Sequence, residues 1–154
     1  WLCGGLAVDL LTGRGVRPHR DVDIFAEADA FASISEAMEK HGWSHDRDWR
    51  VENATTFAND EVSVDVCLVD VSTDGKVKIL GGRQGGEWPG GMLDRHAIPF
   101  DGGVCQTLTA ENLVRMKTTA IEHLMWRMYR IKDIVDLERL RQIIDGEREP
   151  LPIE

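Results

Sequence analysis

The chain has 154 residues, 42% hydrophobic content and a formal net charge of −9. This length fits one domain with a real core, and no apolar run approaches the ~20 residues that span a bilayer. An acidic surface argues against binding to a nucleic-acid backbone and is compatible with a cationic partner.

The cysteines indicate a compartment. Cys3, Cys67 and Cys105 are odd in number and form no Cys-x-x-Cys pair. Reduced, buried thiols account for them without a disulfide or a zinc site, which predicts a cytoplasmic protein. The chain starts at Trp1 without a methionine, and we therefore expect a fragment whose first strand is shortened.

Residues 1–13 predict a strand end, a diglycine turn and a short helix. Glycines at a helix start let backbone amides approach a phosphate closely, which makes Gly4 and Gly5 candidate phosphate-binding residues. A helix this short needs packing to be stable, and its four aliphatic residues supply the contact. Gly13 is expected to end it in a left-handed conformation.

Two carboxylates follow in the stretch 17–24, around which the chain is organised. Side chains alternate between the faces of a strand, so Asp21 and Asp23 share one face. Carboxylates this close repel each other, and a divalent cation such as Mg²⁺, which prefers oxygen ligands, relieves the repulsion. The alternative is a solvated strand end with no ligand.

A third carboxylate lies in the strand predicted at residues 61–70. Its valines share one face, and Ser63, Asp65 and Cys67 share the other. Asp65 is flanked by valines and is poorly suited to a solvated surface. It becomes a third metal ligand if its strand lies beside the strand that carries Asp21 and Asp23.

Two motifs stand in the N-terminal segment 1–24: Gly4-Gly5-x-Ala7-x-Asp9-Leu10-Leu11-x-Gly13 and Arg17-x-His19-x-Asp21-Val22-Asp23-Ile24. With these motifs the segment resembles the nucleotidyltransferases of the DNA polymerase β superfamily, and within them the lincosamide and aminoglycoside 2″-type enzymes. The resemblance implies an α+β fold with an α/β palm: a mixed twisted sheet, flanking helices and C-terminal helices. It also implies that the diglycine holds a triphosphate and that the three aspartates hold Mg²⁺.

The remaining elements are predicted from periodicity and turn signals. An amphipathic helix spans 28–42, with an apolar stripe of Phe31, Ile34, Ala37 and Met38. A glycine-rich loop spans 81–91, and its Trp88 is expected to be a partly buried anchor, the alternative being a ring that stacks on a base or on the acceptor. Thr109 is the expected N-cap of a helical run that continues to residue 145 in two parts. The second part is expected to be lined by Ile134, Leu137, Leu140 and Ile144. Further strands are expected at 50–58, 76–80, 96–100 and 104–108, and a turn at Asn59-Asp60 is expected to join the first of them to the Asp65 strand in a hairpin. The predicted organisation is a palm at 1–108 and a C-terminal helical segment at 109–154 that packs on it.

Basic residues provide candidate phosphate partners. The family motif has an arginine at the position of Arg17. In the superfamily an Arg-x-Lys-Asp element, which residues 130–133 resemble, often opens the last helix. The resemblance therefore implies Lys117, Arg130 and Lys132 as candidate partners of the β- and γ-phosphates. The alternatives are a solvated basic loop for Arg17 and exposed helix ion pairs for the others, for example Lys132 with Asp136. His19 is expected to be structural and to form a hydrogen bond near the metal carboxylates.

The function implied by the resemblance is nucleotidyl transfer. A nucleoside triphosphate, expected to be ATP, gives a nucleoside monophosphate to a hydroxyl of a small cationic acceptor, an aminoglycoside or a lincosamide. Two Mg²⁺ ions clamp the attacking and leaving oxygens, and Asp65 is the candidate general base. The alternatives are a toxin-type transferase acting on tRNA or protein, and a non-catalytic nucleotide-binding module. Metal-dependent nucleotide binding distinguishes the last of these.

Overall fold

The computed structural model describes residues 1–46, 54–80, 87–123 and 131–146. Its helices are α1 Gly4–Thr12, α2 Phe31–Lys40, α3 Ala110–His123 and α4 Ile131–Ile144, with a 3₁₀ turn at Ala28–Ala30 before α2. Its strands are β1 Leu2–Cys3, β2 Asp21–Glu27, β3 Ser44–Asp46, β4 Ala54–Ala58, β5 Ser63–Val71, β6 Val77–Ile79, β7 Glu87–Trp88, β8 Arg95–Phe100 and β9 Gly103–Leu108.

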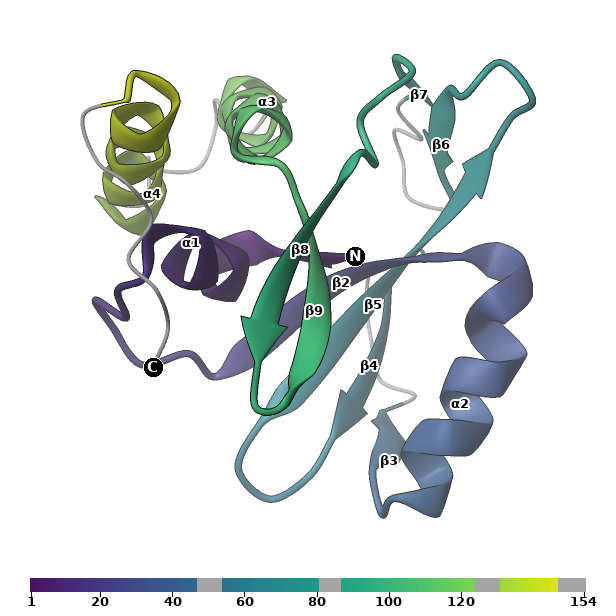
Figure 1. Ribbon diagram of the computed structural model, residues 1–154. Helices are drawn as coiled ribbons and strands as arrows, with labels where there is room; N and C mark the ends of the chain where they lie inside the picture. The colour runs from purple at the N-terminus through teal and green to yellow at the C-terminus, as the bar shows by residue number, and fades with distance from the viewer. Residues whose placement is uncertain (47–53, 81–86, 124–130, 147–154) are drawn as a thin grey trace.

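The strands of the described ranges form one mixed sheet in the order β3-β4-β5-β2-β1-β9-β8, with β6 paired to β5 and β7 to β6. β2 and β5 are parallel, whereas β4 is antiparallel to β5 and β1 is antiparallel to β2. Helices flank this sheet on both sides (Figure 1). The predicted mixed sheet with flanking helices is confirmed.

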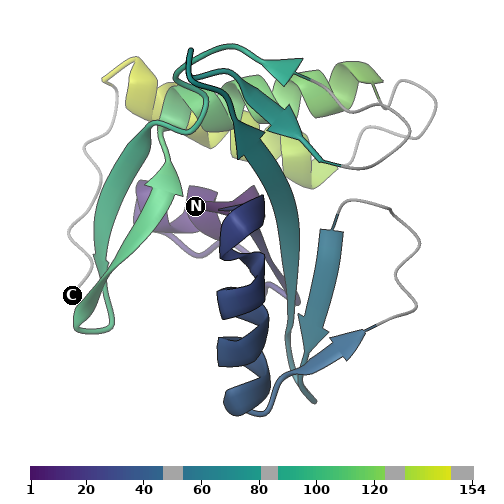
Figure 2. The same cartoon turned by 90° about the vertical axis from the view of Figure 1, so that its right-hand side faces the viewer.

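One face of the sheet is covered by α2, which runs along it (Figure 2). The buried residues Ala26, Phe57 and Val66 form the centre of this contact. The predicted apolar stripe of the helix, which includes Phe31 and Ile34, packs against them. Since strand side chains alternate, the odd-numbered residues of β2 point away from α2.

The other helices, α1, α3 and α4, gather on the opposite side of the molecule (Figure 1). Val8 and Leu11 of α1 are buried with Leu113 of α3 and Leu140 of α4 in the larger core cluster. α1 touches both α3 and α4, although they are far apart in sequence. None of the described helices combines the length and apolar character needed to cross a bilayer.

Several local predictions are confirmed. The side-chain oxygen of Asn59 accepts hydrogen bonds from the amides of residues 61 and 62, which forms the turn of the β4–β5 hairpin. Thr109 Oγ1 accepts a hydrogen bond from the amide of Asn112 and caps α3. Gly13 ends α1 with a φ of 64°. Trp88 is half-buried, and its ring makes an edge-to-face contact with Phe25.

Other local predictions need correction. The two short strands β3 and β7 were not expected from the sequence, because two or three residues give no measurable alternation. The predicted strand at 50–58 is described only from residue 54. Ile134 and Ile144 were expected to line the second helix, but they are exposed, whereas Leu137 and Leu140 are buried. The glycine-rich loop lies largely outside the described residues.

Candidate active site

Three carboxylates lie on the face of the sheet opposite α2. In the parallel pairing of β2 and β5, Asp23 is in register with Asp65, and Asp21 is in register with Ser63. Residues paired in register on neighbouring strands point to the same side of the sheet. The strand arrangement that the sequence required for a shared site is therefore present.

The charges around Asp23 are mutually unfavourable. Partial burial raises the pKa of the Asp23 carboxyl, and the nearby charges of Asp21 and Asp65 raise it further. Lys117 from α3 and Lys132 from α4 act on the same pKa in the opposite direction. These two lysines therefore bring positive charge toward the carboxylates, but they do not cancel the repulsion. A site with this balance favours a bound cation.

Asp65 is already held by a neighbour. The hydroxyl of Thr56 on β4 donates a hydrogen bond of 2.6 Å to Oδ1 of Asp65, and Thr56 is buried. Within the described ranges, no three His, Cys, Asp or Glu side chains are positioned to ligate one ion together. The three aspartates nevertheless fit Mg²⁺ in three respects: they offer oxygen donors, they are negatively charged, and they share one face of the sheet. Joint coordination requires rotation of their side chains.

The two glycines at the start of α1 are in close contact with the site. Gly4 has a φ of +69°, and a Cβ added there would overlap the carboxylate of Asp23. A Cβ on Gly5 would overlap the guanidinium of Arg17 and approach the ring of His19. The diglycine therefore lets the first turn of α1, with its free backbone amides, lie against both a site carboxylate and a basic side chain.

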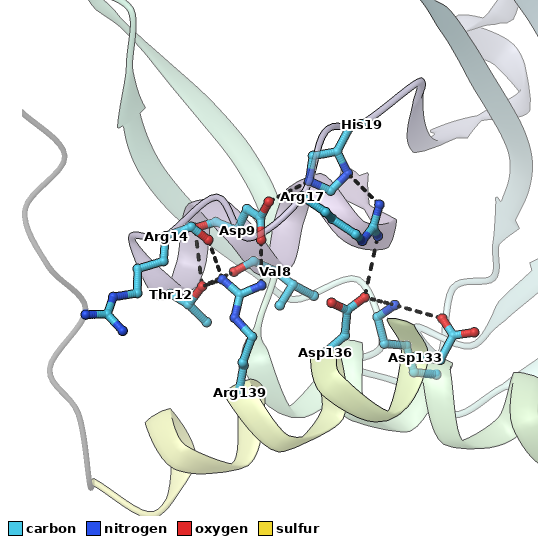
Figure 3. Close-up of polar contacts among 10 residues, drawn as sticks. Val8, Asp9, Thr12, Arg14, Arg17, His19, Asp133, Asp136 and Arg139 are labelled. Carbon is cyan, nitrogen blue, oxygen red and sulfur yellow. Dashed lines mark hydrogen bonds and ion pairs between the residues drawn. The ribbon is translucent and has the colours of Figure 1, made fainter. Parts of the chain in front are cut away.

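One chain of polar contacts joins α1, the segment before β2 and α4 (Figure 3). Nε2 of His19 lies 2.5 Å from Oδ2 of Asp9, and Nη1 of Arg139 donates to Oδ1 of the same carboxylate at 2.5 Å. Arg139 also donates to Thr12 and to the carbonyl of Arg14. Because a carboxylate only accepts, Nε2 of His19 carries the proton, and its Nδ1 can accept from Arg17.

A second chain begins at Arg17 and ends on α3 (Figure 3). The guanidinium of Arg17 lies 3.8 Å from Oδ2 of Asp136, and Nζ of Lys117 lies 2.8 Å from the same oxygen. Lys117 also pairs with Asp133 at 3.4 Å. Asp136 is 2% exposed and Lys117 is 7% exposed, so this is a buried cluster. Among the described residues, the buried Nε of Arg17 has no hydrogen-bond partner.

Most of the predicted site residues lie together in the structure. The aspartates, the glycines, Arg17, Lys117 and Lys132 gather around the start of α1 and the β2–β5 pair. His19, which was expected to have a structural role, forms a hydrogen bond with Asp9 of α1. The alternative for the lysines was an exposed pair of Lys132 with Asp136, but in the described residues Asp136 is buried and pairs with Lys117. Arg130 lies outside the described residues. The sequence analysis assigned no role in the site to Asp9, Thr56, Asp136 or Arg139.

The fold is that of the antibiotic adenylyltransferases. The lincosamide adenylyltransferase LnuA, solved with bound lincomycin, superposes with a TM-score of 0.65 at 20% identity, covering 93% of this chain and 85% of that one. ANT(2″)-Ia, solved with adenylyl-2″-tobramycin, gives a TM-score of 0.65 at 13% identity, covering 96% of this chain and 80% of that one.

Sequence comparison places the chain more narrowly. A profile of the aminoglycoside-2″-adenylyltransferase family matches residues 1–115, and the chain belongs to this family. A lincosamide resistance protein of Staphylococcus haemolyticus is 29% identical over 77 residues, which are 50% of this chain and 48% of that protein. The match thus spans about half the length of this relative. The superfamily resemblance read from the first residues is confirmed.

Proposed function

We propose that the protein is an Mg²⁺-dependent nucleotidyltransferase that moves AMP from ATP to a hydroxyl of an antibiotic, an aminoglycoside or a lincosamide, in the cytoplasm. The observation that carries the proposal is the register of Asp23 with Asp65, on the sheet face that also holds Asp21. The contact between Gly4 and Asp23 supports it, because it sets a helix N-terminus, suited to phosphates, beside the carboxylates. Family membership supports the choice of reaction.

In the proposed reaction the acceptor hydroxyl attacks the α-phosphorus of the triphosphate in line, and pyrophosphate leaves. Asp21 and Asp23 would hold two Mg²⁺ ions, and Asp65 would complete the coordination of one. When bound, these ions stabilise charge on the attacking and leaving oxygens. Asp65 also takes the hydroxyl proton, while the hydrogen bond from Thr56 fixes the orientation of its carboxylate.

The phosphates would be bound from the helical side. The first amides of α1 at Gly4 and Gly5 are free of intrahelical partners, as in every helix start. Arg17 lies against Gly5, and its Nε is available among the described residues. Lys117 and Lys132 extend positive charge toward Asp23. Together these groups can compensate a triphosphate that carries several negative charges.

The proposed class of acceptor rests on the net charge of the chain and on the names of its relatives. The formal net charge of −9 attracts polycations over long range, and aminoglycosides carry several ammonium groups. The relatives named above act on a lincosamide or an aminoglycoside according to their names. We therefore place an aminoglycoside first and a lincosamide second.

The test is a panel of aminoglycosides and lincosamides incubated with ATP, with and without Mg²⁺, and read by mass spectrometry of the acceptor. The expected result is a mass gain of one AMP residue on at least one antibiotic, dependent on Mg²⁺, with release of pyrophosphate. A panel with no modified acceptor, together with ATP binding that does not change when Mg²⁺ is removed, would reject the proposal in favour of a non-catalytic module.

A further inference from the structure

Two charged residues on α4 contact the short segment that leads into β2: Arg139 at the carbonyl of Arg14 and Asp136 at the side chain of Arg17. Asp136 and Arg139 are three positions apart, so they lie on the same side of the helix, one turn from each other. Asp136 holds Arg17, and Arg139 holds Asp9, which in turn holds His19. Asp21 follows His19 by two residues. Helix α4 is therefore connected to the candidate site through two sets of ionic contacts, which meet at the hydrogen bond between Arg17 and His19.

Asp136 has a second partner that matters for phosphates. Its Oδ2 lies 2.8 Å from Nζ of Lys117, and the same lysine acts electrostatically on Asp23. One buried carboxylate thus faces two of the cations that surround the start of α1. A cation fixed in a buried pair loses rotamer freedom before any ligand binds, which lowers the entropic cost of binding.

Resting on the proposed function, we infer that Asp136 and Arg139 are positioning residues of the triphosphate site. Asp136 holds Arg17 and Lys117 in place for the β- and γ-phosphates. Arg139 fixes Asp9 and His19, and through the ring of His19 it supports the guanidinium of Arg17 from its other side. Neither residue needs to touch the nucleotide for this role.

Removal of the charge of Asp136 tests the inference directly, because electrostatics and positioning predict opposite changes in the affinity for a triphosphate. By simple electrostatics, removing a negative charge near a triphosphate strengthens binding. By positioning, the Asp136→Asn substitution frees Arg17 and Lys117 and weakens binding. The Arg139→Lys substitution preserves the charge but cannot reproduce the forked contacts with Asp9, Thr12 and Arg14. Any loss in this variant reflects geometry rather than charge.

The experiment measures dissociation constants of ATP and AMP in the presence of Mg²⁺ by isothermal titration calorimetry on the full chain. AMP has the same base, ribose and α-phosphate, so the preference for ATP over AMP reports on the β- and γ-phosphates. We expect Asp136→Asn to reduce that preference about tenfold, and Arg139→Lys to reduce it severalfold. Glu138→Gln, an exposed change of the same charge on the same helix, is the matched control and should leave the preference unchanged.

The outcomes separate this inference from the proposed function. If the wild-type protein binds no ATP, the proposed function fails. If the wild-type protein prefers ATP, but Asp136→Asn keeps or increases that preference, the positioning role is wrong. A general loss of folded protein lowers ATP and AMP binding together and leaves their ratio intact. Should Asp136→Asn not fold, Arg139→Lys decides: an unchanged ratio in that variant overturns the inference.

Discussion

Gly4 and Asp23 are in such close contact that the carboxylate occupies the space where a side chain at position 4 would begin. The Gly4→Ala substitution adds this overlap to the cost of a positive φ. We expect it to reduce the free energy of unfolding by roughly 1–3 kcal/mol and to abolish nucleotidyl transfer, since Asp23 must move. Thermal unfolding and the antibiotic assay measure the two effects.

The control for this change is Gly102→Ala. Gly102 has a similar φ of +73°, but a Cβ there meets nothing within 4 Å. It isolates the backbone cost from the contact with Asp23. Equal losses of stability and equal activities in the two variants would contradict a specific role for the Gly4 contact.

A second prediction concerns Asp23 itself. Its folded-state pKa is raised by burial and by the charges of Asp21 and Asp65. A carboxyl group whose pKa is raised on folding stabilises the fold fully only below its unfolded-state pKa, about 4. This stabilisation is lost as the pH rises from that value through the folded-state pKa. Asp23→Asn should therefore raise the melting temperature at neutral pH without Mg²⁺, and the difference should vanish in acid.

The same variant should lose nucleotidyl transfer, because an amide is a poor ligand for Mg²⁺. Mg²⁺ should stabilise the wild-type protein but not Asp23→Asn. Asp70→Asn removes an exposed charge from β5 and serves as the control for net charge. Turnover of Asp23→Asn close to that of the wild type would reject the metal role.

The third prediction tests the orientation of Asp65. Thr56→Val removes the hydroxyl that donates to Oδ1 of Asp65 at 2.6 Å, with little change in shape. We expect a fall in stability of about 1 kcal/mol and a fall in kcat of about tenfold, with the KM for ATP nearly unchanged. Thr55→Val, on the opposite face of β4, is the matched control. A change in KM alone would assign Thr56 to binding.

The fourth prediction concerns Gly5. A Cβ at this position would meet the tip of Arg17 and the ring of His19, which are side chains that can move. Gly5→Ala should therefore fold, but it should displace the guanidinium from the start of α1. We expect the KM for ATP to rise while the affinity for the antibiotic stays within about twofold, measured by steady-state kinetics. An unchanged KM for ATP would remove Arg17 from the triphosphate site.

Much of the site was predictable because its signals are local. The alternation of charged and aliphatic residues placed Asp21 and Asp23 on one face, and the valines around Asp65 showed that a carboxylate lay in a strand. Only one long-range assumption was then needed, that β2 and β5 are neighbouring strands, and their register places Asp23 beside Asp65. The turn at Asn59 and the cap at Thr109 are also local patterns.

The missed residues depend on contacts between distant parts of the chain. Asp9 carries the same signal as Asp65, a charge between aliphatic neighbours, and it is indeed 7% exposed. This pattern predicts that the charge of Asp9 is buried, but it does not predict the partner of Asp9, which is Arg139, 130 positions away. Asp136 likewise reads as an ordinary charged helix residue until α3 and α1 are placed around it.

The Asp9–Arg139 pair has a consequence for how relatives of this protein diverge. Asp9 lies within the segment that the family profile matches, whereas Arg139 lies beyond its end at residue 115. A buried carboxylate stripped of its cation costs the fold about 3–5 kcal/mol. Lineages that remodel the C-terminal helix should therefore exchange the acid at position 9 in the same step, and the two sites should covary across an alignment.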